Sequence, residues 1–433
     1  MTKPTSKALA SGSLTPSSYT VKSAVLTKLD KDIEISNLLN KFEIIESLDT
    51  PYLEVLMTMV DATNFLEELK ISGDEKITLK LSRDPNSDKD DPAQFLLNLR
   101  IAEVFQYFRN EPTKQFYRFR CVSHHVYNNQ VLNLSHSFRG TIGSLISELC
   151  DIVKVTNKDI DTASKSIIKG IYPAIKPLSA ASWLLRNAFS SNTHYYFYET
   201  AKDQMVNLKS YNDLAKEDTY ETYEFLPGFK NEIGSEDYYD EVRKRIRIID
   251  GDLNMGQLQH LANGSYSSTL HTLDIATKTF SKTKYSYKDG KLNKNKTIPA
   301  SSVVLNKNLD EQFDSKNYYV SLNSKAFDGV DNYHAPLDGS LSDSVAAKKK
   351  LEFNTFNIII PGDFELSVGK LIEIRVIKAS DSDHLDTKNL EDKYFSGKYL
   401  VTRIVHDFND EYVQRLTIKR DSIGVQIWLV MDM

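Results

Sequence analysis

Two pairs of carboxylates, Glu75–Asp84 and Glu241–Asp250, have the spacing of the catalytic acids in one class of lysozymes. In such enzymes one carboxylic acid protonates the glycosidic oxygen while a second carboxylate stabilises the sugar cation. That motif also places a threonine six residues after the aspartate, where this chain has Asp90 and Gly256. With 59 acidic residues in the chain, such pairs arise by chance. We therefore predict no catalytic residue and no enzymatic activity.

A short cluster of cysteine and histidine, formed by Cys121, His124, His125 and His136, has the residue types of a metal site. On a strand Cys121 and His125 share a face but lie about 13 Å apart at roughly 3.3 Å per residue, too far to share one ion. We interpret the cysteine as a buried thiol and the histidines as ordinary strand residues. The chain also lacks the Cys-x-x-Cys and His-Glu-x-x-His spacings, the phosphate-binding loop and the Gly-x-Ser-x-Gly turn. No metal and no cofactor are predicted.

Two further features invite a binding function but have simpler structural explanations. The basic run Arg243–Arg247 has the charge of a phosphate-binding segment. Its alternation around Ile246 also fits a strand with one solvated face, or a salt-bridging segment at a subunit interface. Trp183 and the run Tyr195–Tyr198 have the residue types of a sugar platform, but their helical and strand spacing favours the core. A formal net charge of −5 argues against a general nucleic-acid binder.

The composition indicates a packed, multidomain protein that folds in a reducing compartment. A length of 433 residues, 40% of them hydrophobic, predicts two to four domains with sizeable cores. The 23 tyrosines and 20 phenylalanines favour β-structure. Two cysteines are too few for a disulfide framework, which fits folding in a cytosol. The N-terminus has no apolar signal core and no run approaches eighteen apolar residues, so no membrane span is expected.

Changes in periodicity and composition divide the chain into five segments. A Ser/Thr-rich start predicts a flexible tail, and a long stretch of Lys, Asn, Ser and Asp predicts a polar insert. The segments are a tail at 1–18, a first β region at 19–125, an α+β connecting domain at 126–239, a second β region at 240–424 with the insert at 281–350, and a C-terminal tail at 425–433.

The elements inside these segments follow from the spacing of apolar residues. Period-two alternation predicts strands at 42–47, 53–60, 76–81, 95–105, 116–122 and 195–198, and helical spacing predicts helices at 141–153 and 178–189. The charged, proline-containing stretch 82–92 predicts a solvent-facing loop. Near the end, the alternating segments 395–406 and 412–422 predict a β-hairpin around the polar turn 407–411.

A faint internal repeat links the two β regions. The strand that follows Gly73 resembles the strand that follows Gly369. A strand at 119–124 and another at 401–406 both end in histidine, and residues 46–61 are similar in pattern to 250–274. The pattern favours a duplicated β module.

Taken in order, these segments resemble the baseplate hub proteins of contractile-tailed, T4-like bacteriophages. The resemblance rests on Ile44–Asp61 and the Gly73 strand, on Tyr172–Glu199, on Asn263–Asp274, and on Ile358–Val376 with the closing hairpin. It covers roughly residues 20–280 and 350–424. The insert and the residues past Ile423 depart from the family's pattern. The order of the segments, rather than any single motif, carries the likeness.

The resemblance implies a mainly β fold with two similar tail-tube-type β-barrels per chain and an α+β connecting domain. Hubs of this family are homotrimers whose six barrels form a pseudo-sixfold ring around the DNA channel. The implied function is structural: the ring joins the hexameric tail tube to the trimeric central spike. Implied partners are the tail tube protein, the central spike protein, the tape-measure protein and baseplate wedge proteins. The implied location is the virion tail baseplate, assembled in the host cytoplasm, with no specific nucleic-acid binding.

Two alternatives stay open at this point. One is a tail-associated module that binds a receptor or carbohydrate through its aromatic residues. The other is a hub of a bacterial contractile injection system, which would have the same fold without a capsid. Glycan or host-cell binding would distinguish the first from a hub, and neighbouring genes for capsid and terminase would argue against the second.

Overall fold

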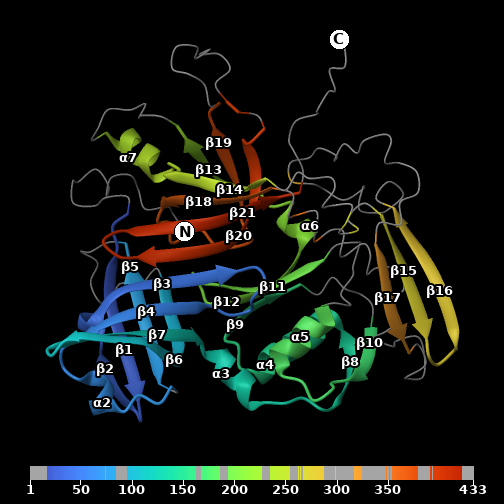
Figure 1. Ribbon diagram of the computed structural model, residues 1–433, viewed down its shortest axis with the longest axis horizontal. Helices are drawn as coiled ribbons and strands as arrows, with labels where there is room; N and C mark the ends of the chain where they lie inside the picture. Colours follow the sequence, from blue (N-terminus) through green and yellow to red (C-terminus); the bar gives the residue numbers. More distant parts are fainter. Residues whose placement is uncertain are drawn as a thin grey trace.

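A computed structural model of the chain describes residues 17–73, 75–83, 95–161, 167–185, 194–226, 235–253, 262, 264, 267–286, 298, 316–323, 348, 351, 354–378, 391–392 and 394–421. Within these residues the protein is mainly β, as predicted, and most strands belong to one large sheet. Figure 1 shows this sheet on one side of the molecule, with a group of helices below and a small separate sheet on the opposite side. Both predicted tails fall almost wholly outside the described residues.

The N-terminal elements show the alternation that the sequence predicted. β4 (Glu54–Asp61) buries every second side chain, because successive side chains of a strand point to opposite faces. All five strands predicted before residue 125 are confirmed. The elements are β1 (Thr20–Lys28), β2 (Lys31–Glu34), the 3-10 helix η1 (Ser36–Leu38), β3 (Leu39–Ser47), β4, α2 (Phe65–Leu69), β5 (Lys76–Ser82), β6 (Phe95–Glu111) and β7 (Lys114–Ser123).

The middle of the chain forms an α+β unit around its own core. Helix α4 (Ile142–Ile152) begins where the Thr141 side chain accepts a hydrogen bond from the Ser144 amide at 3.2 Å, and its apolar face packs into this core. The unit also contains α3 (His124–Val131), β8 (Ser137–Thr141), β9 (Asn157–Ile160), β10 (Ile167–Ile171), α5 (Pro177–Leu185), β11 (Tyr195–Thr200), β12 (Met205–Ser210) and α6 (Tyr211–Leu214). Strands pair as β10-β8 and as β11-β12-β9.

The C-terminal elements extend the large sheet. The predicted hairpin is confirmed as β20 (Gly397–Phe408) and β21 (Tyr412–Arg420), which pair antiparallel. β13 (Thr219–Phe225) pairs with β19, so this part of the predicted connecting domain belongs to the large sheet. The other elements are α7 (Glu236–Arg243), β14 (Ile248–Leu253), β18 (Asn354–Pro361) and β19 (Leu371–Val376).

A separate sheet of three strands stands beside the large one. β15 (Ser267–Asp274) lies between β16 (Thr279–Ser286) and β17 (Asn317–Leu322), in the order β16-β15-β17. Most side chains of β16 are exposed. Part of the polar stretch predicted as an insert therefore contributes strands to this sheet. Most of residues 281–350 lies outside the described residues.

The large sheet contains two sets of six strands in the same order. In the first strand set (β1 and β3–β7) the neighbours run β3-β4-β7-β6-β5-β1, and in the second strand set (β13, β14 and β18–β21) they run β14-β18-β21-β20-β19-β13. When the strands of each set are numbered in chain order, the two sets have the same sequence of neighbours: β1 corresponds to β13, β3 to β14, β4 to β18, β5 to β19, β6 to β20 and β7 to β21. The two sets differ in the direction of their last strand, because β1 pairs antiparallel with β5 whereas β13 pairs parallel with β19. An antiparallel ladder between β20 and β3 joins the two sets.

Irregularities in the ladders repeat as well. The β6–β7 ladder shifts register between Ile101 and Glu103, and the β20–β21 ladder shifts between Val401 and Arg403. The Ile101 amide donates to the Glu75 carbonyl at 3.0 Å, and the Val401 amide donates to the Lys370 carbonyl at 3.0 Å. Bulges are local features that kink a strand at a defined residue, so their coincidence supports a repeated module. Residue 101 corresponds to residue 401 in this alignment.

This alignment corrects part of the predicted repeat. The glycine-led strands were matched correctly, as β5 and β19, and Gly73 and Gly369 both have positive φ, at 95° and 88°. The match of 119–124 with 401–406 is wrong, because β7 corresponds to β21 rather than to β20. The match of 250–274 with 46–61 is correct only for β14 and β3, since β15 lies in the separate sheet. Alternating strands of similar length are interchangeable in sequence, and only the ladders tell them apart.

Two local predictions are wrong because helices occupy segments interpreted as strands. His124 and His125 open helix α3 instead of ending a strand. The basic run is not a strand either: Arg243 is the last residue of α7, whose N-terminus is capped by the Ser235 side chain. Arg243 pairs with Asp240 in its own helix, and Arg247 pairs with Glu411 within the chain. The run passes from the end of α7 through a turn at Lys244 to an isolated parallel β-bridge between Arg245 and Glu224.

Candidate functional site

Several long-range polar contacts gather at the junction between the two strand sets. Along the β20–β3 ladder, Ile404 stands opposite Glu46 and His406 opposite Ile44. Glu46 and His406 are both completely buried. A charged side chain placed in a core needs several hydrogen-bond partners, so the surroundings of this carboxylate explain why it is tolerated.

Glu46 connects all three parts of the chain. It accepts hydrogen bonds from the Ala201 amide at 3.0 Å, from the Val368 amide at 3.2 Å and from His406 Nε2 at 3.0 Å. The other ring nitrogen of His406 lies 2.8 Å from the Tyr412 hydroxyl. One carboxylate on β3 thus holds the loop after β11, the loop before β19 and strand β20 in a single arrangement.

A second buried carboxyl, that of Glu199 on β11, ties the α+β unit to the first strand set. Its Oε2 atom accepts from the Leu53 amide at 2.9 Å and lies 2.5 Å from the Ser123 hydroxyl. Burial raises the pKa of Glu199 from its ordinary 4.5 to about 8, and nearby Glu46 adds to the rise, although the two hydrogen bonds oppose it. The carboxyl is therefore protonated in the folded protein at neutral pH.

Glu199→Gln is expected to flatten the dependence of stability on pH. Between pH 4.5 and about 8 the unfolded carboxyl is ionised while the folded one is protonated. Unfolding then releases a proton, and the free energy of unfolding falls as pH rises, by about 1.4 kcal/mol per pH unit at most. The stability that the protonated Glu199 carboxyl contributes is fully present below pH 4.5 and is lost as pH rises through about 8. Urea unfolding from pH 5 to 8 measures the slope. Glu365→Gln is the control, because Glu365 is an exposed carboxylate that pairs with Lys202. Equal slopes in both variants would contradict the assignment.

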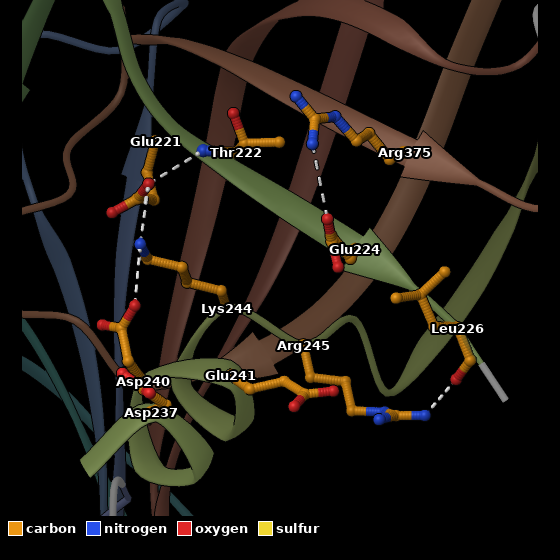
Figure 2. Close-up of a pocket in the computed structure, with 10 residues that line it drawn as sticks. All are labelled: Glu221, Thr222, Glu224, Leu226, Asp237, Asp240, Glu241, Lys244, Arg245 and Arg375. Atoms are coloured by element: carbon orange, nitrogen blue, oxygen red, sulfur yellow. Dashed lines mark hydrogen bonds and ion pairs between the residues drawn. The ribbon is translucent and has the colours of Figure 1, made fainter. Parts of the chain in front are cut away.

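A polar cavity of about 440 Å³ lies between β13, α7 and β19 (Figure 2). Its charged groups are engaged with one another: Lys244 Nζ lies 2.9 Å from Asp240 and 3.4 Å from Glu221. Arg375 approaches Glu224 at 3.5 Å. Burial opposes the charge of Asp240, but Lys244 and Arg243 outweigh it and lower the pKa of Asp240. Burial also opposes the charge of Lys244, but Asp240 and Glu221 outweigh it and raise the pKa of Lys244, so this pair stays ionised near neutral pH and holds α7 against β13.

The carboxylates singled out from the sequence occupy unrelated places. Glu75 accepts from Lys28 Nζ at 2.7 Å and from the Ser72 and Gly73 amides. Burial alone would raise its pKa, but these bonds lower the pKa of Glu75 to about 2. A proton donor needs a pKa nearer the working pH, so Glu75 is not suited to that role. Its sequence partner Asp84 lies outside the described residues, while Glu241 and Asp250 stand on α7 and β14.

The cysteine and histidine residues also separate into structural roles. Cys121 is fully buried in the first core, and burial raises the pKa of its thiol well above the usual range. His125 Nε2 donates to the Pro51 carbonyl at 2.8 Å, and burial lowers the pKa of His125 to about 4 despite that bond. The His136 ring packs edge-on against Tyr172. Among the described residues, no three His, Cys, Asp or Glu side chains gather as metal ligands would.

The predicted core role of the aromatic residues is confirmed. Tyr196, Phe197 and Tyr198 of β11 are buried, and Trp183 of α5 packs against the same core as Phe197. None of them forms an open sugar platform. In the described part of the chain, no helix is both long enough and apolar enough to cross a bilayer.

Comparison with known proteins identifies the architecture. No family model matches the sequence, and no curated protein matches it either. Among solved structures, the chain is similar to the tail protein from Neisseria meningitidis MC58, with a TM-score of 0.50, 11% identity, and coverage of 94% of this chain and 98% of that one. It is also similar to the 43 kDa tail protein of prophage MuSo2 from Shewanella oneidensis, with a TM-score of 0.51, 8% identity, and coverage of 92% and 97%. The chain has a tail-protein fold.

The likeness extends over nearly the full length of both tail proteins, so the strand sets and the α+β unit together form the shared fold. At 8% and 11% identity the likeness is one of architecture rather than of particular residues. The Glu46 and Glu199 junctions were missed from the sequence, because each carboxylate sits in an ordinary strand pattern. A glutamate at a core-facing position of a strand, as at Glu46, is the one signal that was available.

Proposed function

We propose that this chain is a structural component of a phage tail baseplate and, within it, the hub. Three copies would form a ring that joins the hexameric tail tube to the trimeric central spike. The observation that carries the proposal is the repeated order of six strands, with bulges at matching steps. Each strand set would be one tube-type barrel, the first spanning about 19–125 and the second about 240–424 together with β13, and the α+β unit would connect them.

The repeat supports a symmetry adaptor for a geometric reason. Two similar modules in one chain, repeated three times around an axis, present six similar surfaces to a sixfold partner and three identical surfaces to a threefold one. The β20–β3 ladder holds the two modules side by side in one sheet, as a ring requires. Tube, spike, tape-measure and wedge proteins are the proposed partners in the virion baseplate.

The polar groups of the fold support a structural rather than an enzymatic role. Glu46, Glu75 and Glu199 are each held by hydrogen bonds from the backbone or from buried side chains. The ionised groups of the cavity in Figure 2 pair with one another. These groups stabilise the arrangement of strands and helices.

The face of the large sheet that points away from the cores is suited to line a DNA channel. This face carries several ion pairs: Arg415 lies 2.9 Å from Glu43 and 3.3 Å from Asp407, and Arg120 lies 2.6 Å from Glu54. Paired charges present little net attraction for phosphates, whereas a basic wall would retain DNA through counterion release. We infer a wall past which DNA moves without binding.

Light scattering on the purified chain, alone and mixed with the spike protein encoded beside it, tests the proposal. A mass of three times 49.3 kDa, or a complex of three chains with three spike subunits, is expected. A chain that stays monomeric and does not bind the spike would remove the adaptor role. Glycan arrays run in parallel would then test the receptor-binding alternative.

A further inference from the structure

The two outer edges of the repeated modules have no strand partner within the described residues. β6 pairs with β5 only from Phe95 to Arg100, although it continues to Glu111. β14 pairs with β18 along one edge, and no described strand pairs with its other edge. The outer part of β6 exposes Val104, and its Tyr107 and Phe108 are each 57% exposed. Unpaired edges with apolar side chains are templates for pairing with another chain, so a protein that leaves them open must cover them.

The β20–β3 ladder inside the chain shows how two such edges pair. β20 pairs with β19 over its first residues, from Gly397 to Leu400, and then with β3 from Arg403 to Phe408. β6 corresponds to β20, and β14 corresponds to β3. The edge of β6 beyond Arg100 and the edge of β14 are therefore the counterparts of two edges that already form a ladder inside the chain.

We propose that β6 of one copy pairs antiparallel with β14 of the next copy, in the register of the β20–β3 ladder. This inference rests on the proposed trimer and specifies the surface that would build it. Each copy offers one β6 edge and one β14 edge, so the contact is head-to-tail and generates a ring. The occupant of each edge is thus a second copy of this chain.

The internal ladder determines the register between copies. Ile101 corresponds to Val401, so Val104 corresponds to Ile404. Matching the ladders of β4 with β3 and of β18 with β14 makes Glu46 the counterpart of Leu253. Because Ile404 stands opposite Glu46 within the chain, Val104 of one copy stands opposite Leu253 of the next.

An ion pair at the same place supports this register. The same matching makes Arg118 on β7 the counterpart of Arg415, and Asp250 on β14 the counterpart of Glu43. Arg415 and Glu43 form a 2.9 Å salt bridge across the internal junction. Asp250 is exposed and Arg118 is half-buried on the same face of the sheet. In the proposed register, Arg118 of one copy therefore lies beside Asp250 of the next, as Arg415 lies beside Glu43 within the chain.

Cross-linking of paired cysteines tests the register. In a background with Cys121 and Cys150 replaced by alanine, Val104→Cys with Leu253→Cys is expected to give covalent dimers and trimers under mild oxidation. A disulfide needs Cα atoms within about 7 Å. The control pair, Val104→Cys with Asp250→Cys, is displaced by three residues, about 10 Å along the strand, and is expected not to cross-link. Mixing the two single variants, Val104→Cys and Leu253→Cys, should give dimers only, which shows that the bond joins different copies.

Charge reversal provides an independent readout in the otherwise unmodified chain. Arg118→Glu is expected to weaken self-association at least tenfold, measured as the chain concentration at which half of the trimer has dissociated. Adding Asp250→Arg should restore most of the association. A trimer by light scattering that neither cross-links at 104–253 nor responds to these reversals would overturn the strand pairing and leave the hub proposal intact. A chain that is monomeric at every concentration, both alone and when mixed with the spike protein, would overturn both.

Discussion

Replacing Glu46 by alanine is expected to lower the free energy of unfolding by about 3–5 kcal/mol, because three buried hydrogen bonds end on its carboxyl group. The substitution leaves the Ala201 amide, the Val368 amide and His406 Nε2 without their acceptor in a region closed to water. Each buried donor left unsatisfied costs about 1–3 kcal/mol. Urea unfolding followed by tryptophan fluorescence and circular dichroism measures the loss. Because Glu46 joins the three parts of the chain, we also expect faster proteolysis between them.

Glu43→Ala on the same strand is the matched control. Glu43 faces the opposite side of the sheet and forms a partly exposed salt bridge with Arg415. Such pairs contribute about 0–1 kcal/mol. Glu46→Gln should fall between the two, since the amide keeps one acceptor and the shape of the side chain. If Glu46→Ala unfolds at the same urea concentration as Glu43→Ala, the buried junction does not stabilise the fold as argued.

Gly362→Ala is expected to destabilise the protein by about 3 kcal/mol, the cost of overpacking a filled core. A β-carbon at residue 362 would lie 2.0 Å from Cδ1 of Tyr412. The Tyr412 ring has little room to move, because it stacks on Phe408 with ring centroids 4.2 Å apart and packs against Phe364 at 4.7 Å. Its hydroxyl is also held by His406 at 2.8 Å.

The double variant Gly362→Ala/Tyr412→Leu separates this clash from a general effect on the backbone. Leucine removes the ring that the new methyl group would strike, so the double variant should lose clearly less stability than the sum of the two single variants. Chemical denaturation of all four proteins completes the cycle. Additive losses would show that Gly362 is required for its backbone conformation instead of for the space it leaves.

The elements predicted correctly are those whose signal is local. β4 alternates strictly between buried and half-buried residues, and α4 has apolar side chains at helical spacing after a threonine cap. In each case the periodicity follows from one face of one element meeting a core. Segments without a clean period were misjudged. Helix α3 is short and polar, and the basic run ends a helix whose cap, Ser235, lies eight residues before Arg243.

The sequence by itself determined that this protein is mainly β, that it has an α+β segment in the middle and a closing hairpin, and that no familiar catalytic or metal-binding spacing is present. Only the tertiary structure decided which strands are neighbours, and with them the β20–β3 ladder, the matching bulges and the Glu46–His406 contact, whose partners are 360 residues apart. The physical reason is that a strand's alternation records which face is buried but not which strand lies beside it. Partners so distant in the chain leave no periodic mark on either segment.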